Sequence, residues 1–457
     1  MSKSIIEKVV EAPALVLEKT MEVSETIGEK LNMDEPAKKA KAYWKTLGPG
    51  LTTGAADDDC SGIVTYSQEG AKYGFQLNWL ALFTFPLMAG VQEMCARIGI
   101  VTGRGLAANI KNYFPRWVLI AATLLLFAAN TFNIGADIAA MSEAMRLLTP
   151  AIAFGFLAVF FTILTLFLQI FVSYKVYSKY LKYLSFVLIA YVITAFLPTV
   201  KMDWVSALRS TVIPSLSLSK EQIILICGIL GTTISPYLFF WQASQEVEEE
   251  TLLGEVTIKL RQDGVTPEKL KKMRTDVWSG MFYSNAVMFF IVSVCASVLY
   301  KAGITNIATA SDAADALRPI AGDNAYLLFA VGIIGIGLLA IPVLAGSISY
   351  ALSESFGWRE GLHYELKKAS AFYGVIIIAT LVGLGINFIG LDPIKALIYA
   401  AVANGLAAPL LLIIIVLTSS SKKIMGVHAS GMGSKILGWL CAGLMTVAGV
   451  ATIYSFF

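Results

Sequence analysis

Long apolar segments separated by short polar stretches recur along nearly the whole chain. Each segment of about 20 residues is long enough to cross a bilayer as a helix, and about eleven such segments can be placed. They lie near residues 46–68, 76–101, 117–147, 151–173, 181–199, 221–247, 277–300, 323–352, 370–390, 394–417 and 434–456. The pattern therefore predicts an all-α polytopic membrane protein, with the lipid bilayer as its surroundings.

Basic residues are distributed unevenly among the predicted loops. When the N-terminus is placed in the cytoplasm, every inner loop is rich in Lys and Arg, and the outer loops hold few. This asymmetry predicts an odd number of spans across the cell (cytoplasmic) membrane, with the N-terminus in the cytoplasm and the C-terminus outside the cell. Residues 1–44 alternate charged and apolar positions and are predicted to form a cytoplasmic N-terminal segment. Residues 45–457 are predicted to form the transmembrane domain.

The composition excludes several classes of protein. The chain is 56% hydrophobic and 15% charged, its net charge is only +3, and its five cysteines are scattered singly. Such a charge does not favour nucleic acid as a partner, and the cysteine spacing fits no metal finger or redox motif. The two histidines, His363 and His428, fall in predicted inner loops. No histidine cluster or nucleophile motif predicts an enzyme, and no cofactor is implied.

Three consecutive carboxylates interrupt the first predicted span, at Asp57, Asp58 and Asp59. A carboxylate inside a membrane is costly and requires a cation or a polar cavity beside it. Pro49 and the flanking glycines favour a broken helix at this point, with free carbonyl groups turned toward a ligand. The first span therefore predicts a cation path through the membrane.

The sixth predicted span contains a second interruption, where Ser235 precedes Pro236. A proline inside a helix removes one backbone hydrogen bond and frees a carbonyl group. Broken helices at matching positions of two halves are typical of inverted repeats that bind ligands at the membrane midplane. The sequence thus predicts one repeat over about 45–200, a second over about 220–417, and an extra helix over about 434–456.

Several short motifs resemble the Nramp family of transporters. They are Gly48-Pro49-Gly50, Asp59 to Gly62, Glu69 to Phe75, Ile98 to Arg104, and Gly231 to Tyr237. The resemblance implies the leucine-transporter-type fold of inverted five-helix repeats, with helices 1 and 6 broken. It also implies proton-linked import of divalent transition-metal ions.

The chain departs from the family pattern at positions that contact the metal. The family reads Asp-Pro-Gly-Asn where this chain has Asp59-Cys60-Ser61-Gly62, and it reads Met-Pro-His where this chain has Ser235-Pro236-Tyr237. The second family histidine is replaced by Gln242. Loss of the thioether and of the asparagine leaves a wider site of hard oxygen ligands, which suits partly hydrated Mg²⁺. The pattern resembles the Nramp-related magnesium transporter branch, for which Mg²⁺ and Mn²⁺ are the implied substrates.

The resemblance and the breaks together indicate the metal-site residues. We expect Asp59 to neutralise and coordinate the ion, with hydroxyl or carbonyl oxygens from Thr232 and Ser235 and carbonyl oxygens from Ala56 and Thr233. Cys60 beside Asp59 leaves a softer alternative open, because a thiolate would favour Mn²⁺, Zn²⁺ or Cd²⁺. The predicted metal-site residues are Asp59, Ser235, Thr232, Ala56, Thr233, Gly62 and Asn404.

Four further acidic residues could serve the ion path without binding the metal directly. Asp57 and Asp58 either line an outer vestibule or cap the helix break, and Asp137 and Glu93 are candidates for a relay. In the family a Glu follows the Asp of the third span, and here Ala140 stands in its place. With that residue and both histidines absent, we predict import of Mg²⁺ without obligatory proton coupling. The alternatives are a proton-coupled Mn²⁺ importer and, more distantly, a sodium-coupled amino-acid carrier of the same fold.

Overall fold

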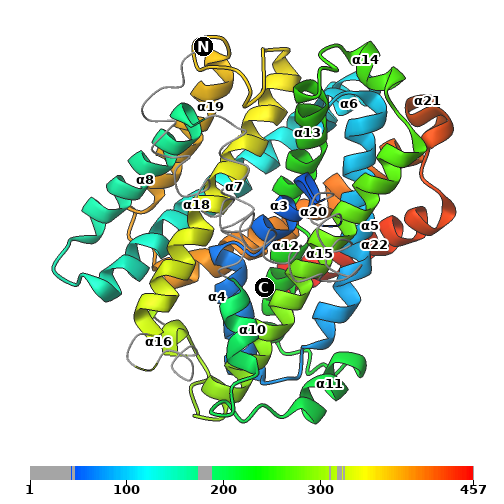
Figure 1. Cartoon of the computed structure of the whole chain (residues 1–457). Helices are drawn as coiled ribbons and strands as arrows, with labels where there is room; N and C mark the ends of the chain where they lie inside the picture. Colours follow the sequence, from blue (N-terminus) through cyan, green and yellow to red (C-terminus); the bar gives the residue numbers. More distant parts are fainter. Residues whose placement is uncertain are drawn as a thin grey trace, which may run out of the picture.

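The computed structural model describes residues 43, 47–172, 188–307, 310–315, 322 and 325–455. Within these ranges the chain is almost entirely helical, and eight helices are long and apolar enough to cross a membrane (Figure 1). The predicted segment 1–44, apart from residue 43, and residues 181–187 of the predicted fifth span lie outside the described residues. The described remainder of that span contains α10 (Ile189–Ala195). The helical architecture agrees with the all-α prediction.

The first span is broken into α3 (Pro49–Asp57) and α4 (Cys60–Tyr73), which lie near the centre of the molecule (Figure 1). Pro49 occupies the first helical position, where its missing N–H costs nothing. Asp59 caps α4, because its carboxylate accepts a hydrogen bond from the Gly62 amide. The predicted break therefore falls at the acidic triplet.

The sixth span is broken in the same way. Its halves are α12 (Lys220–Thr233) and α13 (Pro236–Leu252), with Ile234 and Ser235 between them. Pro236 stands at the first position of α13, so the break follows from the proline that the sequence places there. Two broken helices thus meet at the middle of the bundle, as predicted.

Unbroken helices surround the two breaks. On one side, α7 (Arg116–Leu148) packs against α18 (Ala325–Phe356), α19 (Ser370–Ile386) and α8 (Phe154–Phe171). The predicted third span, interrupted by Asn130, Asn133 and Asp137, is thus a continuous helix.

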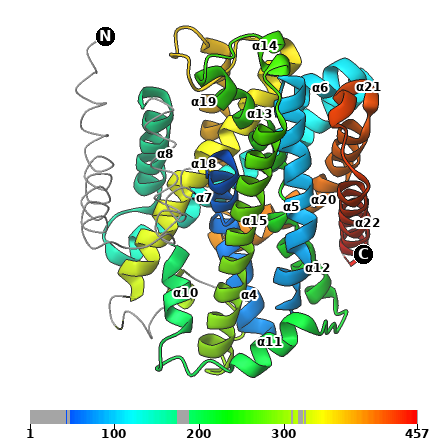
Figure 2. The same ribbon diagram turned by 45° about the vertical axis from the view of Figure 1, so that its right-hand side comes forward.

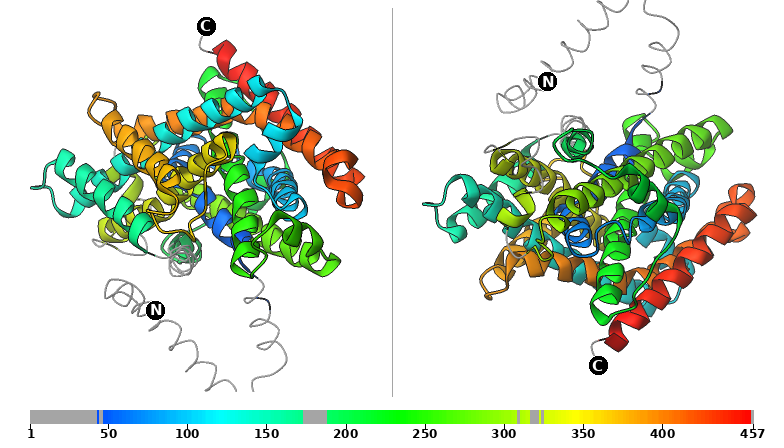
Figure 3. Two further views of the ribbon diagram at one scale, coloured as in Figure 1. Left: turned by 90° about the horizontal axis from the view of Figure 1, so that it is seen from above. Right: turned by 90° about the horizontal axis from the view of Figure 1, so that it is seen from below.

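A second set of helices completes the bundle. In this set, α15 (Pro267–Cys295) packs against α3, α4 and α5 (Trp79–Thr102), and it runs nearly the full height of the molecule (Figure 2). Two further helices, α20 (Pro393–Ser420) and α22 (Met432–Ser455), pack against α12. Seen from above and below, α8 and α22 lie on opposite sides of the molecule (Figure 3).

Glycines allow the broken helices to touch their neighbours backbone to backbone. A Cβ atom on Gly54 would lie 2.2 Å from the carbonyl oxygen of Gly280 on α15. A Cβ atom on Gly280 would lie 2.0 Å from the carbonyl oxygen of Gly50. On the other side, a Cβ on Gly231 of α12 would lie 2.2 Å from the carbonyl oxygen of Ala401 on α20. Small residues at such contacts are typical of close helix packing in membranes.

Shorter helices connect the long ones. The α15 helix continues into a π-helical turn, η2 (Ala296–Tyr300), and Thr266 caps its start by accepting a hydrogen bond from the Lys269 amide. The remaining short helices are α6 (Leu106–Tyr113), α11 (Trp204–Val212), α14 (Ile258–Asp263), α16 (Ala310–Asp315), α21 (Lys422–Met425) and η4 (Gly426–His428).

Candidate metal site

The Asp59 carboxylate lies at the break of the first span, with none of its surface exposed. Its Oδ1 atom accepts hydrogen bonds from Ser61 Oγ at 2.6 Å and from the Gly62 amide at 2.7 Å. Its Oδ2 atom accepts one from Asn133 Nδ2 on α7 at 2.8 Å. These donors stabilise the ionised carboxylate and fix its direction, so that its remaining lone pairs are available to a cation.

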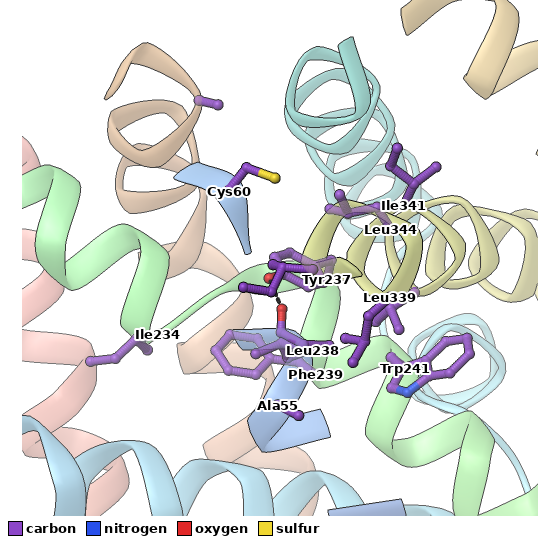
Figure 4. Close-up of a cluster of buried hydrophobic side chains, with 14 of the residues drawn as sticks. Ala55, Cys60, Ile234, Tyr237, Leu238, Phe239, Trp241, Leu339, Ile341 and Leu344 are labelled. Carbon is purple, nitrogen blue, oxygen red and sulfur yellow. Dashed lines mark hydrogen bonds between the residues drawn. The ribbon is translucent and has the colours of Figure 1, made fainter. Parts of the chain in front are cut away.

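Tyr237 joins the two broken helices beside this carboxylate. Its hydroxyl group donates a hydrogen bond to the Ala56 carbonyl oxygen at 2.8 Å and lies 3.4 Å from Asp59 Oδ2. The ring is fully buried among apolar side chains, including Leu238, Leu339 and Leu344 (Figure 4). Tyr237 therefore fixes the end of α3 relative to α13.

Oxygen atoms converge closely around Gly62. A Cβ atom at this position would lie 3.1 Å from Thr232 Oγ1, 3.4 Å from the Asp57 carbonyl oxygen and 3.5 Å from Asp59 Oδ1. Thr232 is fully buried, and its hydroxyl oxygen has no hydrogen-bond partner among the described residues. A hydroxyl, a carbonyl and a carboxylate oxygen thus converge where the family has an asparagine side chain. A purely oxygen set of this kind suits a hard cation.

The other predicted ligands of the second break are largely engaged by backbone groups. Ser235 Oγ donates hydrogen bonds to the carbonyl oxygens of Thr232 at 2.6 Å and Gly231 at 2.9 Å. Thr233 Oγ1 donates to the Ile229 carbonyl oxygen at 2.7 Å and contacts the Tyr66 hydroxyl group at 3.1 Å. These bonds satisfy carbonyl groups at the break. The Ser235 hydroxyl group uses its hydrogen in them, so its oxygen lone pairs remain available to bind an ion.

Asn404 lies on α20 at the level of the second break. Its neighbours Ala401 and Gly405 contact Gly231 of α12, which adjoins Thr232. The Asn404 side chain is fully buried, and neither of its amide atoms has a hydrogen-bond partner among the residues that the structure describes. Such a group is costly in a dry interior, and a ligand or its bound water would satisfy it.

Asp137 and Cys60 lie near each other, on the side of the site that faces α7 and α18. Asp137 follows Asn133 by one helical turn on α7, and it is fully buried. The Cys60 thiol donates to the Ile333 carbonyl oxygen of α18 at 3.6 Å. The thiol is therefore directed at the scaffold, and the Asp137 carboxyl group lies close to both Cys60 and Asp59.

Asp57 and Asp58 face the opposite way, toward α15. Ser284 Oγ on that helix donates to Asp57 Oδ2 at 2.7 Å and lies 3.3 Å from Asp58 Oδ1. Neither carboxylate has any exposed surface. The triplet therefore divides, with Asp59 directed at α7 and its two neighbours directed at α15.

Glu93 is held in an ion-paired network between α5 and α15. Its carboxylate lies 2.6 Å from Arg97 Nη2 and 3.2 Å from Arg274 Nε, and it accepts a hydrogen bond from Trp278 Nε1 at 2.7 Å. These contacts occupy both carboxylate oxygens, so the structure places Glu93 in a helix-to-helix connection and not beside Asp59.

Sequence reasoning assigned no metal-site role to Asn133, Tyr237, Ser61 or Ser284, which contact the triplet. Asn133 was expected to form an interhelical hydrogen bond, and it does so, with Asp59 as the acceptor. The available signal was its spacing of one turn from Asp137 in an apolar segment. Tyr237 stands where the family has a histidine, which was a second signal.

Two broken helices with a buried carboxylate between them define a transporter built from inverted repeats. The sequence profile described as "Natural resistance-associated macrophage protein-like" matches residues 50–455, and the chain belongs to this family, Nramp. The family is one of transporters and not of enzymes, and its members need no cofactor. The resemblance seen in the sequence motifs is thereby confirmed.

Relatives and solved structures agree with this assignment. The chain is 26% identical over 428 residues to the divalent metal cation transporter MntH of Caldanaerobacter subterraneus, covering 91% of this chain and 94% of that protein. MntH of Erwinia tasmaniensis is 27% identical over 316 residues, covering 67% and 72%. The structure resembles the Eremococcus coleocola manganese transporter, with a TM-score of 0.67, 17% identity, and 90% and 86% of the chains covered.

A more distant structural neighbour is Mhp1, a nucleobase-cation-symport-1 family transporter. The TM-score is 0.53 at 15% identity, with 89% of this chain and 91% of that chain covered. At these identities the likeness concerns the fold alone. The predicted leucine-transporter-type architecture is confirmed.

Proposed function

We propose that this protein imports divalent metal cations across the cytoplasmic membrane, with Mg²⁺ as the preferred substrate and Mn²⁺ also carried. The observation that carries the proposal is the convergence of three oxygen atoms at Gly62, namely Thr232 Oγ1, the Asp57 carbonyl oxygen and Asp59 Oδ1. The names of the MntH relatives support divalent metal transport in general. The basic inner loops support a cytoplasmic N-terminus, and a C-terminus outside.

The preference for Mg²⁺ follows from the type and spacing of the ligands. Mg²⁺ gives up its waters reluctantly and usually binds through one or two carboxylates while keeping several of them. Asp59 supplies the charge, and Thr232, whose buried hydroxyl oxygen has no hydrogen-bond partner among the described residues, can hydrogen bond to a retained water. Ser235 replaces the family's methionine and offers oxygen in place of sulfur, which removes the ligand that favours softer metals.

Transport requires that the two broken helices open the site to each side in turn. In this structure the side chains of Asp59, Thr232, Ser235 and Asn404 have no exposed surface, which corresponds to an occluded state. We propose that α3 and α13 move relative to the scaffold of α7, α8, α18 and α19 to release the ion. The membrane potential adds about 2.3 kcal/mol per charge per 100 mV to the inward driving force.

We propose further that protons are not obligatory for this movement. The family's sixth-span histidines are replaced by Tyr237, whose hydroxyl group bonds to a carbonyl oxygen, and by Gln242, whose Nε2 donates to Glu246 Oε1 at 2.8 Å. Neither side chain exchanges protons near neutral pH. Asp137 lies close to Asp59, but Ala140 stands where the family has a Glu, so the family's acidic relay is incomplete.

The direct test is Mg²⁺ entry into vesicles that contain the purified protein and a magnesium-sensitive dye. Wild-type protein should admit Mg²⁺, Mn²⁺ should compete, and Asp59→Asn should abolish entry because it removes the charge without changing the shape. Glu143→Gln on α7, a surface-paired carboxylate, is the matched control and should transport normally. Absence of Mg²⁺ entry while Mn²⁺ or Cd²⁺ is still carried would refute the Mg²⁺ preference and direct attention to Cys60.

A proton-coupled Mn²⁺ importer is the second candidate, favoured by the buried Asp137 close to Asp59. The two candidates differ in one measurement. A pH-sensitive dye in the same vesicles should report no metal-dependent acidification under the first proposal. Acidification that accompanies metal entry and is lost in Asp137→Asn would establish the second.

A further inference from the structure

An apolar groove lies between α5 and α15 on the outside of the helix bundle. It has a volume of about 150 Å³ and is lined by residues of these two helices and of α11. Two lining residues, Leu82 on α5 and Phe282 on α15, are 46% and 62% exposed. Both helices are long and apolar enough to cross a membrane, so these exposed side chains face the hydrocarbon of the bilayer. The groove is therefore open to lipid.

The polar side chains that line the groove are already hydrogen bonded within the protein. Thr211 Oγ1 donates to the Ala207 carbonyl oxygen at 2.8 Å. Asn285 Nδ2 donates to the Met281 carbonyl oxygen at 3.0 Å, and Asn285 Oδ1 accepts from Thr84 Oγ1 at 2.9 Å. All other lining residues are alanine, leucine or phenylalanine. The groove therefore favours an apolar ligand.

The size of the groove corresponds to part of an acyl chain. A protein cavity of about 150 Å³ with apolar walls holds a benzene molecule, so the groove has room for about six carbon atoms. Its walls include aromatic rings, among them Phe85, which packs edge-on against Phe282 at a centroid distance of 5.7 Å. Lipid chains are as apolar as these walls, so close packing and not transfer from water favours a chain in the groove.

The short helix α11 borders the groove and marks the level of the membrane surface. It packs against α5 at the lower end of the molecule in Figure 1, on the side predicted to be outside the cell. Its side chains Val205, Leu208 and Val212 are 78%, 56% and 63% exposed. An exposed apolar face on a helix that also carries charge is typical of a helix at the boundary between headgroups and acyl chains.

Arg209 supplies a positive charge at this level. It is exposed, and no ion pair among the described residues involves it. It precedes Thr211 by two positions, about 3 Å along the helix axis, and a long arginine side chain can extend to the headgroup level. A guanidinium group binds phosphate through two parallel hydrogen bonds. A phosphate group beside Arg209 and an acyl chain in the groove together correspond to a phospholipid.

We propose that a phospholipid from the leaflet on the α11 side binds here, with one acyl chain in the groove and its phosphate group beside Arg209. Phe282, Ala286 and Phe289 line the groove at helical spacing, on the side of α15 opposite to Gly280. Gly280 is the residue through which α15 contacts α3. The lipid thus supports, from behind, the helix that holds the first span. This proposal goes beyond metal transport and does not depend on which ion is carried.

The test counts bound lipid and does not measure transport, so its failure is separate from failure of the proposed function. The purified full-length protein in detergent is titrated with dioleoyl phosphatidylglycerol, and native mass spectrometry measures the occupancy of each bound molecule. The first molecule should bind about tenfold more tightly than the later ones. Dioleoylglycerol has the same chains without the phosphate group, and its first molecule should bind about fivefold more weakly than the phospholipid.

Variants assign the first lipid to the groove. Ala286→Phe places a ring in the groove and should weaken binding of the first phospholipid about tenfold. Because the ring fills a void, this variant should unfold at no lower temperature than the wild type when no lipid is added. Gly374→Phe adds the same ring on α19, where a Cβ atom meets no described atom within 4 Å, and should bind lipid normally. The smaller Ala286→Leu decides the question if Ala286→Phe is not monodisperse.

A further variant assigns the phosphate group. Arg209→Gln should weaken binding of the phospholipid about fivefold and leave binding of dioleoylglycerol unchanged.

Three results would overturn the proposal. The first is a wild-type protein that takes up successive phospholipid molecules with equal affinity. The second is a first phospholipid that binds equally well to the wild type and to both Ala286 variants, which would place the lipid elsewhere. The third is an Arg209→Gln variant that binds the phospholipid as tightly as the wild type does.

Discussion

At the scale of single residues, the site depends on one missing side chain. Because Gly62 has no side chain, Thr232 Oγ1, the Asp57 carbonyl oxygen and Asp59 Oδ1 come within 3.1–3.5 Å of the position that a Cβ atom would take. The selectivity of the site is therefore set by the volume at this position as much as by the identity of the charged ligand.

Restoring the family's asparagine with Gly62→Asn should convert the preference from Mg²⁺ to Mn²⁺. The new side chain adds an amide oxygen that can replace a retained water, and its Cβ atom crowds Thr232 Oγ1. We expect Mg²⁺ uptake relative to Mn²⁺ to fall about tenfold, equivalent to ~1.4 kcal/mol. Dye-based uptake in vesicles measures the ratio.

Gly62→Ala is the matched control for this change. It adds only the Cβ atom, 3.1 Å from Thr232 Oγ1, and should give an intermediate ratio. An unchanged ratio in Gly62→Asn would show that the volume at this position does not set selectivity.

Tyr237 offers a second residue-scale prediction. Tyr237→Phe keeps the ring in its apolar surroundings and removes the hydroxyl group that donates to the Ala56 carbonyl oxygen. A buried hydrogen bond contributes about 1 kcal/mol, and the unpaired carbonyl adds a penalty. We expect a fall of about 2–4 °C in the unfolding midpoint. A midpoint equal to that of the wild type would mean that the hydroxyl group does not hold the two breaks together.

At the scale of helices, α3 is held at both of its ends. At its C-terminus lie the triplet and Tyr237, and at its N-terminus the Asp276 carboxylate on α15 accepts hydrogen bonds from the amides of Gly48 at 2.8 Å and Gly50 at 2.7 Å. The first amides of a helix have no partner inside it, and an acidic side chain there satisfies them and complements the helix dipole. Asp276 thus acts as a cap supplied by another helix.

Removing this cap should favour movement of the N-terminal end of α3 away from α15. For Asp276→Ala we expect the free energy that favours the closed position of α3 over the open one to fall by about 1–2 kcal/mol, the range typical of a helix cap. A cysteine introduced at Thr53, which is fully buried on α3, reports opening through its rate of modification by a thiol reagent.

The modification rate should rise about 5- to 30-fold relative to the same cysteine in the wild-type background. Asp392→Ala removes the cap of α20, which lies elsewhere in the bundle, and should leave the rate unchanged. An equal rate in the Asp276→Ala and wild-type backgrounds would show that the cap does not control closure.

The sequence allowed the breaks to be predicted but not the directions of the side chains within them. Pro49, Pro236 and the acidic triplet are local signals, so the ends of the four half-helices follow from chain chemistry. Inside a break neither the helical nor the strand period applies, so the sequence does not show which neighbouring helix each of Asp57, Asp58 and Asp59 faces. Their division depends on Ser284 and Asn133, which lie on helices far away in the sequence.

At the scale of the whole molecule, α13, α18 and the loop that follows α18 meet in a polar cluster. A cavity of about 150 Å³ is bordered by residues of α13, α18 and the loop that follows α18, among them Glu248, Glu354, Glu360 and His363. His363 Nδ1 lies 2.7 Å from Glu248 Oε1, and the Ala108 amide donates to Glu354 Oε2 at 2.7 Å. The cluster therefore connects α13, which we propose to move during transport, with α18 of the proposed scaffold.

This cluster should make stability depend on pH. Burial, followed by repulsion from Glu354 and Glu248 and partly offset by Arg261, raises the pKa of Glu360 to about 10. The folded state then holds a proton that the unfolded chain releases near pH 4.3, so the contribution of Glu360 is complete below that pH and is lost as the pH rises toward about 10.

We expect the unfolding midpoint of the wild type to fall between about pH 6 and pH 9 and that of Glu360→Gln to fall less. Glu365→Gln is the control, because Glu365 lies on the same loop with an exposed side chain. Parallel pH profiles for the wild type and Glu360→Gln would contradict this assignment.

The glycine contacts between α3 and α15 have a consequence for the speed of the transport cycle. At Gly50, Gly54 and Gly280 the two helices meet through their backbones, with no side chains interleaved between them. Separating interleaved side chains requires each to find a new rotamer, and that search costs time and entropy. Backbone-to-backbone contacts require no such change of rotamers. At these three glycines α3 can therefore slide along α15 without repacking of side chains, and the contact that resists the movement is the Asp276 cap at the start of α3.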